Sequence, residues 1–320
     1  MNRTAVVALG GNALTRAGES GTCDEMLANA AAMAAAVNDV MEAGWRVVIV
    51  HGNGPQVGNL ALQQEAATMV PAQPLALLGA MTQGLLGSLI ARSIDRLRGS
   101  GTAAALVTHV TVDPADPAFD LPAKPIGPFF PATEAQRLAG SRGWVVQPDS
   151  GRGYRRVVAS PQPASVIEIN AVRALVDAGH LVIACGGGGI PVAGTASGYT
   201  ATVDAVIDKD RAAGLIAALL EAEALLLVTA VDRVMLDFGK PTQTALSTIT
   251  AAEAARHLRE GQFPPGSMGP KIEAALRFLD QGGETAVITS PELLAPTLAG
   301  TSNLPGTRIV RTPSQVRQGR

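Results

Sequence analysis

The chain has 320 residues, a formal net charge of −2 at pH 7 and 47% hydrophobic residues, and only 3% of its residues are aromatic. This length and composition predict a globular protein, built as one large domain or as two closely joined lobes. The small net charge argues against a general binder of polyanions, and the scarcity of aromatic side chains argues against a base-stacking surface. We therefore expect no nucleic-acid partner.

The cysteines and the apolar stretches predict the cellular compartment of the protein. Cys23 and Cys185 lie far apart and in no CxxC motif, which is typical of a reducing compartment. The apolar run at residues 6–9 is too short for the core of a signal peptide. Residues 212–231 are apolar, but two glutamates lie near their centre, and each acidic residue at mid-bilayer costs about 2.5–3.5 kcal/mol. We predict a cytoplasmic protein with no membrane partner, in which this stretch is a helix followed by a buried strand.

The first part of the chain alternates between expected strands and expected helices. Short apolar runs predict strands, and longer runs rich in Ala, Leu and Met predict helices. Short connections between them predict a mainly parallel sheet that is covered on both faces. The expected strands are residues 4–10, 46–50 and 104–112, and the expected helices are residues 24–43 and 79–98.

Residues 113–163 interrupt this alternation, because nine prolines fall within them. Such a segment predicts an excursion from the sheet, in the form of a small subdomain or a lid. Beyond it the alternation resumes. The expected helices there are residues 165–178, 208–221, 251–260 and 269–281, and the expected strands are residues 181–185, 224–230 and 285–289.

Three apolar strands end in glycine-rich turns, with the sequences VVALGGN, VVIVHGNG and LVIACGGGG. The carboxyl ends of parallel strands meet at one edge of an open sheet, which is where such folds bind ligands. Glycine lets backbone N–H groups approach a phosphate, and a following helix adds the positive charge of its N-terminus. A tight turn alone would explain any one of these sequences, but three at one edge favour a phosphate site. None has the spacing of GxGxxG or GxxxxGKS/T.

The chain has only four lysines, and three of them lie in unusual sequence surroundings. Lys124 lies in AKPIGPFF, Lys209 lies between two aspartates in VIDKD, and Lys271 follows GSMGP. A lysine ammonium group suits a phosphate oxygen, although each of these could also be a solvated surface residue. Asp208 and Asp210 could orient the lysines or a water bound to Mg²⁺, or could only stabilise a helix N-terminus.

The remaining polar residues do not form a pattern that indicates another chemistry. Asp232 follows an expected strand and suits either a turn or a nucleotide site, and His51 suits a structural donor better than a base. No serine or cysteine lies in a nucleophile elbow, and no spacing suggests zinc. Phosphoryl transfer needs positioned groups and positive charge rather than a protein nucleophile. The residues alone therefore indicate an α/β enzyme that handles phosphate.

A set of motifs then points to a known family. In chain order these are VVALGGNAL, HGNGPQVG, GAMTQG, KPIGPFF, GRGYRRVVASPQP, GGGGIPV, AVIDKD, FGKPTQ and GSMGPK. Together they resemble the carbamate kinases of the amino acid kinase family, over roughly residues 4–310. The resemblance implies a single domain over residues 1–320. Its fold would be an open αβα sandwich around a mainly parallel eight-stranded sheet, with a small protruding subdomain at about residues 113–163.

The resemblance also implies an activity. The part at about residues 1–180 would bind the acceptor and the part at about residues 181–320 the nucleotide, in a homodimer. Phosphoryl transfer would run reversibly between ATP and carbamate, so that carbamoyl phosphate and ADP give ATP and carbamate. Mg²⁺ would be held through phosphates and waters with no direct protein ligand, and in pathways that break down arginine or allantoin the family runs toward ATP. Two alternatives stay open: a kinase of this fold with another small carboxylate or carbamate-like acceptor, and a non-catalytic sensor of nucleotides or anions.

Roles for individual residues follow from the same resemblance. Lys209 and Lys271 would neutralise charge during transfer, Asp210 would organise them and the metal, and Lys124 would reach over the acceptor. The phosphate- and acceptor-binding residues would be Gly10, Gly11, Asn12, Gly52, Asn53, Gly54, Gly187 and Gly188. The nucleotide-binding residues would be Asp208, Asp232 and Met268. The chain departs from the family pattern at Ala159, Asp204 and Ala230, on the nucleotide side and near the subdomain.

Overall fold

The computed structural model describes residues 3–10, 14–16, 18–67, 69–149, 151–195, 198–264, 266–298 and 305–312. Its largest sheet has eight strands in the order β15-β17-β16-β12-β1-β2-β9-β3, and every neighbouring pair is parallel except β16 and β17. The α/β class and the mainly parallel eight-stranded sheet are thus confirmed. The strands are β1 (Thr4–Leu9), β2 (Arg46–His51), β3 (Ala103–Ala105), β9 (Leu181–Ile183), β12 (Ala224–Val228), β15 (Thr248–Thr250), β16 (Thr285–Thr289) and β17 (Thr307–Val310).

Helices cover both faces of this sheet because its central strands are apolar on both sides. In β1, Val6 and Ala8 belong to one core cluster and Val7 to the other, since successive side chains point to opposite faces. One face packs against α1 (Cys23–Glu42), α3 (Leu75–Arg98) and α9 (Leu294–Leu298). The other packs against α5 (Ile169–Asp177), α6 (Lys209–Leu219), α7 (Ala251–Arg259) and α8 (Met268–Asp280), which confirms the αβα sandwich.

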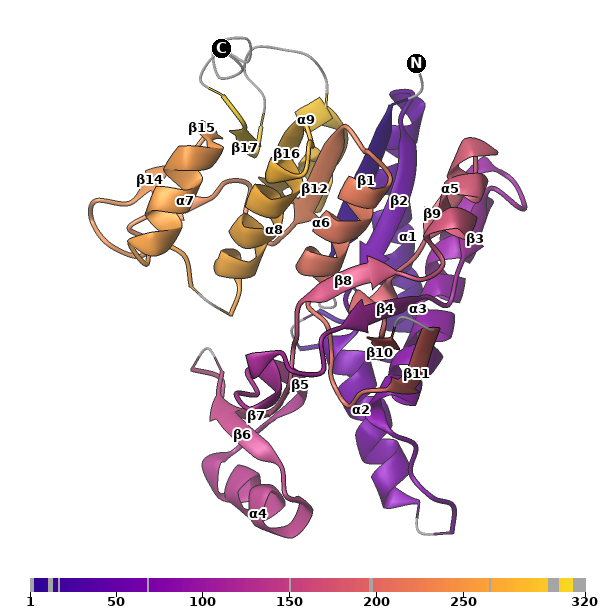
Figure 1. The fold of residues 1–320 in the computed structure, drawn as a ribbon, viewed down its shortest axis with the longest axis vertical. Coiled ribbons are helices and arrows are strands. Elements are labelled where there is room, and N and C mark those ends of the chain that lie inside the picture. Colours follow the sequence, from indigo (N-terminus) through magenta and orange to yellow (C-terminus); the bar gives the residue numbers. More distant parts are fainter. Residues whose placement is uncertain are drawn as a thin grey trace.

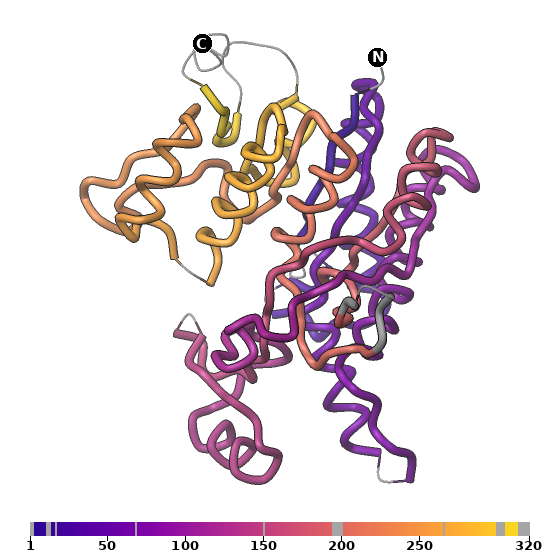
Figure 2. The backbone as a smooth tube through the Cα atoms, in the orientation of Figure 1, coloured from indigo at the N-terminus to yellow at the C-terminus, as the bar shows by residue number. Residues whose placement is uncertain are grey.

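Within the residues that the structure describes, three smaller sheets accompany the main one. A three-stranded sheet of β5 (Lys124–Phe130), β7 (Tyr154–Val158) and β6 (Val145–Pro148) lies with α4 (Ala132–Arg142) at the lower end of the molecule, away from the main sheet (Figure 1). The tube view shows the chain leaving and re-entering the main body there (Figure 2). The remaining elements are β4 (His109–Val112), β8 (Pro163–Val166), β10 (Ile190–Thr195) and β11 (Gly198–Thr202), which form a four-stranded sheet, the pair β13 (Met235–Leu236) and β14 (Thr244–Ala245), and α2 (Gly54–Ala66).

Two expected elements are wrong in their extent. The expected strand at residues 104–112 is two strands in different sheets, because the backbone of Thr108 leaves the ladder and bonds the side-chain amide of Gln83 on α3. The expected helix at residues 165–178 begins only after Glu168. Its first residues continue β8, and the Glu168 carboxylate accepts a hydrogen bond from the His109 backbone N–H at 2.7 Å. Long-range partners decide both boundaries, which a local pattern cannot reveal.

The apolar stretch at residues 212–231 folds as expected. It contains most of α6 and then β12, whose five residues are all buried in the centre of the sheet. Within the described residues, α3 is the one helix whose length and mean hydropathy of 1.3 would suit a membrane span, and half of that stretch is buried inside the fold. A core helix passes the same test, and α3 packs against the sheet.

Candidate active site

The start of α6 gathers the charged residues of VIDKD. Asp208 is the N-cap of this helix, and its Oδ1 atom accepts a hydrogen bond from the backbone N–H of Asp210 at 2.8 Å. Capping by an aspartate satisfies N–H groups that would otherwise lack partners at the first turn. Both carboxylates are therefore held at a rigid helix terminus, with Lys209 between them.

Three lysines from three separate elements meet at these two carboxylates. The Oδ2 atom of Asp210 lies 3.0 Å from Nζ of Lys209 and 2.8 Å from Nζ of Lys271, which lies in the first turn of α8. Lys124, the first residue of β5, places its Nζ atom 2.6 Å from Oδ2 of Asp208. We call these five residues the lysine–aspartate cluster. It holds three of the four lysines of the chain, which the sequence had only indicated one by one.

Asp208, Asp210 and Lys271 are buried and Lys124 and Lys209 are half-buried, so the charges of the cluster interact strongly. Asp210 is 2% exposed and Lys271 is 7% exposed. Burial by itself raises the pKa of a carboxyl group, but the ammonium groups outweigh it. Lys124 and then Lys209 lower the pKa of Asp208, and Lys209 and Lys271 lower that of Asp210. Both aspartates are therefore ionised at neutral pH.

The two lysines that share Asp210 differ in protonation behaviour. Burial lowers the pKa of Lys209, but Asp210 and Asp208 together raise it above its usual value. Burial also lowers the pKa of Lys271. The Asp210 carboxylate raises that pKa, but burial and the nearby positive charge of Lys209 together outweigh it, so the pKa of Lys271 lies below its usual value. An anion that enters beside Lys271 would reverse this, since it would favour the charged ammonium form.

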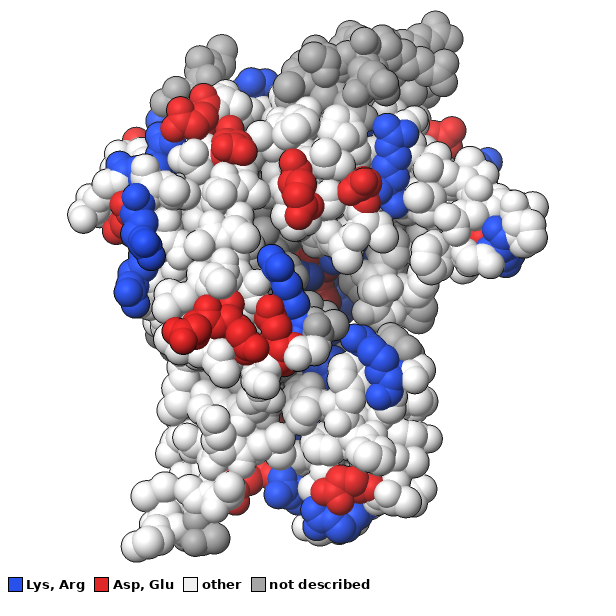
Figure 3. Space-filling model, turned by 180° about the vertical axis from the view of Figure 1, so that it is seen from behind, with Lys and Arg blue, Asp and Glu red and all other residues white. Residues whose placement is uncertain are grey.

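A cavity of about 290 Å³ opens beside the cluster, and the space-filling view shows a hollow near the middle of the molecule in which basic and acidic side chains are visible (Figure 3). All five residues of the cluster line this cavity, and so does Met268, which the sequence had assigned to nucleotide binding. Asp232 does not line it, although its neighbours Val231 and Arg233 do. Apolar side chains add a surface for a flat ring: Met235, Phe238, Phe263 and Pro264.

The glycine turns meet each other as the parallel sheet requires. The backbone N–H of Gly52 donates to the carbonyl of Leu9 at 2.8 Å, which joins the ends of β1 and β2. A Cβ atom on Gly187 would lie 2.2 Å from Nδ2 of Asn53, so only glycine permits the turn after β9 to approach the turn after β2. A Cβ on Gly188 would lie 2.3 Å from the carbonyl oxygen of Ile207, just before the cluster.

The acceptor-side residues predicted from the sequence fall into two groups. Gly52 and the buried Asn53 lie between β2 and α2, and Gly54 is the first residue of α2. Gly10 directly follows β1. The other predicted residues of the first turn, Gly11 and Asn12, lie outside the described residues.

Several residues at the site carried no specific prediction. Thr82 accepts a hydrogen bond from Nδ2 of Asn53 at 2.8 Å and so orients that side chain. Thr82 belongs to GAMTQG, a motif whose order along the chain was noticed but whose residues had no assigned part. Arg233 and Phe238 line the cavity, and Phe238 is the first residue of the FGKPTQ motif. The spacing of residues in the sequence could not identify Arg233 and Phe238, because the path of the loop after β12 brings them to the cavity.

His51 serves structure rather than proton transfer. Its ring is buried, which lowers its pKa to about 4, so it is neutral at pH 7. The Nδ1 atom lies 3.1 Å from the carbonyl oxygen of Gly52, to which it donates in the matching tautomer. This agrees with the expectation of a structural donor. Within the described residues, no group of three or more His, Cys, Asp or Glu side chains could hold a metal ion by themselves.

Comparison with known proteins agrees with this site. Residues 3–290 match the amino acid kinase family. The carbamate kinase of Thermococcus kodakarensis is 43% identical over 314 residues, which is 96% of this chain and 98% of that protein. The structure of carbamate kinase from Giardia lamblia bound to citric acid has a TM-score of 0.91 and 37% identity, covering 97% of this chain and 99% of that one. The same enzyme bound to AMP-PNP gives a TM-score of 0.87 and 36% identity, with the same coverage of both chains.

These likenesses extend over nearly the whole chain and are far above the level at which only a fold is shared. They agree with the order of the glycine turns and with the αβα sandwich around a mainly parallel sheet. The chain therefore belongs to the amino acid kinase family and, within it, to the carbamate kinases.

Proposed function

We propose that this chain catalyses reversible phosphoryl transfer between ATP and carbamate, in which carbamoyl phosphate and ADP give ATP and carbamate. The observation that carries the proposal is the lysine–aspartate cluster beside the 290 Å³ cavity and next to the glycine turns. A transferring phosphoryl group spreads negative charge over three oxygens, so positioned ammonium groups stabilise the transition state. No covalent step on the protein is needed.

The cluster suggests a part in the transfer for four of its five members. Lys209 and Lys271 contact the phosphoryl group in flight, and Asp210 holds both ammonium groups close together before the substrates arrive. Lys124 extends from β5 toward the acceptor site. Gly52, Asn53 and Gly54 lie at the N-terminus of α2, on the acceptor side of that site. Positioning of this kind contributes to catalysis because the charges need not reorganise during the reaction.

The first glycine turn and the turn after β9 would complete the phosphate site. Gly10, Gly11 and Asn12 would offer backbone N–H groups after β1, and Gly187 and Gly188 would do so after β9. The support is the sheet itself, which brings these chain ends to one edge. Backbone donors that converge in this way suit an anion better than a cation.

ATP and ADP are the proposed nucleotides, with Asp208, Asp232 and Met268 on the nucleotide side. The likeness to a structure bound to AMP-PNP supports this, and the apolar lining beside Met268 suits an adenine ring. Mg²⁺ would neutralise the phosphates. The Oδ1 atom of Asp210 is buried and has no hydrogen-bond partner among the described residues, so it fits a water held by such an ion. The ion would thus bind through phosphates and waters.

The proposal also covers the oligomeric state, the cellular compartment and the pathway. We expect a homodimer in the cytoplasm that acts in arginine metabolism or a related breakdown pathway. On α3, Leu77, Met81 and Leu85 recur every four residues and are each more than 40% exposed, so they form an apolar stripe along one helix face. A second copy of this chain would cover that stripe.

The test is ATP formation from carbamoyl phosphate and MgADP, followed through hexokinase and a glucose-6-phosphate dehydrogenase, with a blank that lacks the chain. We expect rapid formation of ATP that depends on Mg²⁺. The same fold with a different small carboxylate or carbamate-like acceptor would give no ATP above the blank although the folded chain binds ADP. A non-catalytic sensor is not favoured, because all three lysines of the cluster are in place.

A further inference from the structure

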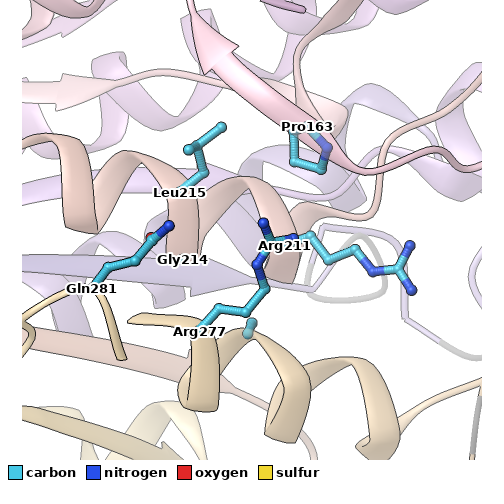
Figure 4. A pocket seen from close by; sticks show the side chains of 7 residues that line it. Pro163, Arg211, Gly214, Leu215, Arg277 and Gln281 are labelled. Carbon is cyan, nitrogen blue, oxygen red and sulfur yellow. The ribbon is translucent and has the colours of Figure 1, made fainter. Parts of the chain in front are cut away.

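Arg211 follows Asp210 in α6 and does not line the cavity, yet it contacts two other parts of the molecule. Its Nη1 atom donates to the backbone carbonyl of Ser160 at 3.2 Å, and its Nη2 atom lies 3.2 Å from Oε2 of Glu273 on α8. In the small cavity between α6 and α8, the side chains of Arg211 and Arg277 extend beside Pro163 (Figure 4). A planar guanidinium group can hold two partners at once, which a single ammonium group does less well.

Ser160 belongs to the segment that returns from the three-stranded sheet to the main body. This return segment, residues 159–162, follows β7 and precedes β8. The backbone N–H of Val206 donates to the carbonyl of Ala159 at 3.0 Å, and Arg277 donates to the side chain of Gln162. The return segment is thus held from the side of α6 and α8.

The return segment in turn places Lys124. In the antiparallel pair β5–β7, Lys124 lies directly opposite Val158, two residues before Ser160. Lys124 then reaches Oδ2 of Asp208, which caps the helix that carries Arg211. These contacts link the start of α6 to Lys124 in two ways. Arg211 bonds Ser160, which is two residues from Val158, the partner of Lys124 in β7, and Lys124 itself bonds Asp208, the N-cap of α6.

Glu273, the second partner of Arg211, connects these contacts to α8. Glu273 lies two residues after Lys271, and the two helices approach closely: a Cβ on Gly214 of α6 would lie 3.1 Å from the carbonyl oxygen of Ala274 on α8. Arg211 therefore joins α6 and α8, which supply Lys209 and Lys271, to the return segment that follows β7, the strand paired with the one that carries Lys124.

We propose that Arg211 is a positioning residue for phosphoryl transfer, which sets Lys124 relative to Lys209 and Lys271 without touching substrate. This proposal rests on the proposed function. Misplacing a charged group by about 1 Å can lower a rate about a hundredfold, so a side chain outside the cavity can matter for the reaction. The step itself belongs to the lysines, and Arg211 acts through them.

The test uses Arg211→Met, which removes the donors and keeps most of the side-chain length. We expect kcat for ATP formation to fall by about ten- to a hundredfold, while KM for MgADP stays within about twofold, because Arg211 does not line the cavity. Arg211→Lys, which keeps the positive charge and one donor nitrogen, should recover part of the loss. A matched control is Arg173→Met, because Arg173 also donates to a backbone carbonyl of α6, that of Leu219 at the far end. It should leave kcat within about twofold.

A double-mutant cycle with Lys124→Ala decides whether Arg211 acts through Lys124. If it does, Arg211→Met should lower kcat by no more than about threefold when Lys124 is already absent, because coupled residues are not additive. Equal losses in both backgrounds, or an unchanged kcat for Arg211→Met alone, would overturn the proposal.

Hydrogen exchange separates this proposal from the proposed function. The amide of Val206, which bonds to Ala159, should exchange faster in Arg211→Met and at the wild-type rate in Arg173→Met. Unchanged exchange in Arg211→Met would show that Arg211 does not fix the return segment. If the wild-type chain made no ATP at all, the proposed function would fail, and the exchange result alone would decide whether Arg211 holds this segment.

Discussion

Nζ of Lys271 and Oδ2 of Asp210 lie 2.8 Å apart, although 61 positions separate the two residues in the chain. The same oxygen atom also accepts a hydrogen bond from Nζ of Lys209 at 3.0 Å. One buried carboxylate thus holds two ammonium groups that would otherwise repel each other. The site depends on this arrangement both for its stability and for the charge that it presents to a phosphoryl group.

Asp210→Asn should weaken both the fold and the reaction. Removing one partner of a buried ion pair costs about 3–5 kcal/mol, because the remaining charges stay buried without compensation. Urea unfolding would measure this loss, and the ATP assay should show turnover at least about a hundredfold lower. The control is Asp237→Asn, since Asp237 pairs with the exposed Lys240, and an exposed pair contributes at most about 1 kcal/mol. Equal effects of the two substitutions would contradict the central part given to Asp210.

Lys209→Ala should lower turnover by about two or more orders of magnitude, as the loss of a transition-state contact does. Lys240→Ala is the matched control, because Lys240 is the fourth lysine of the chain and its side chain is 66% exposed. Its turnover should equal that of the wild type. A folded Lys209→Ala variant with near wild-type turnover would remove this lysine from the mechanism.

Gly187→Ala should be worse than the same change at a glycine that also has a positive φ but has free space around it. Gly187 has φ 65°, and its new Cβ would meet Asn53 at 2.2 Å, whereas Gly179 has φ 91° and no atom within 4 Å of the added Cβ. Backbone strain alone should cost each variant about 1–2 kcal/mol. We expect Gly187→Ala to lose more than this in urea unfolding, and to raise KM for carbamoyl phosphate. Equal unfolding costs would mean that Asn53 moves aside freely.

His51 predicts how stability depends on pH. Its pKa is about 4 in the folded chain and should be near 6.5 when unfolded, so the unfolded state binds the proton more readily. The contribution is therefore fully present above pH 6.5 and is lost as the pH falls toward 4. Between pH 7.5 and 5 the wild type should lose about 2 kcal/mol from this group.

Comparison with His51→Gln isolates that contribution, because glutamine cannot take up a proton in this range. Urea unfolding of this variant should give a lower stability at pH 7.5 and a smaller decrease down to pH 5 than in the wild type. The difference between the two slopes reports on His51 alone. Parallel curves for the two proteins would show that the ring is not held neutral by burial.

Replacing residues 113–162 with an Asn-Gly turn should leave a folded but inactive chain. Val112 and Pro163 already lie opposite each other in the antiparallel pair β4–β8, so a tight turn can join them. Lys124 is lost with the deleted residues, and the return segment with it. Circular dichroism and ADP binding would establish folding, and the ATP assay should give no more than the blank. Full activity would show that the deleted residues take no part in the reaction.

Much of the framework was accessible from the sequence, because it rests on local patterns. Apolar runs with short connections predicted the parallel sheet, and most expected elements lie within a few residues of the observed ones. The exceptions are instructive: Thr108 leaves the main sheet because Gln83 bonds its backbone, and α5 starts late because Glu168 bonds His109. Each of these contacts joins residues that are distant in the sequence, so no local window contains the cause.

The groups available for chemistry can be read along the chain: three lysines in unusual surroundings, an Asp-Lys-Asp run and glycines at three strand ends. Its motifs also determined the family to which the chain belongs. Packing in three dimensions brings Lys124 to Asp208 and Lys271 to Asp210, and it places Arg211 between α6, α8 and the return segment. The physical reason is that burial makes a charge costly unless an opposite charge lies within a few ångströms. That condition depends on packing between helices and sheets rather than on order along the chain.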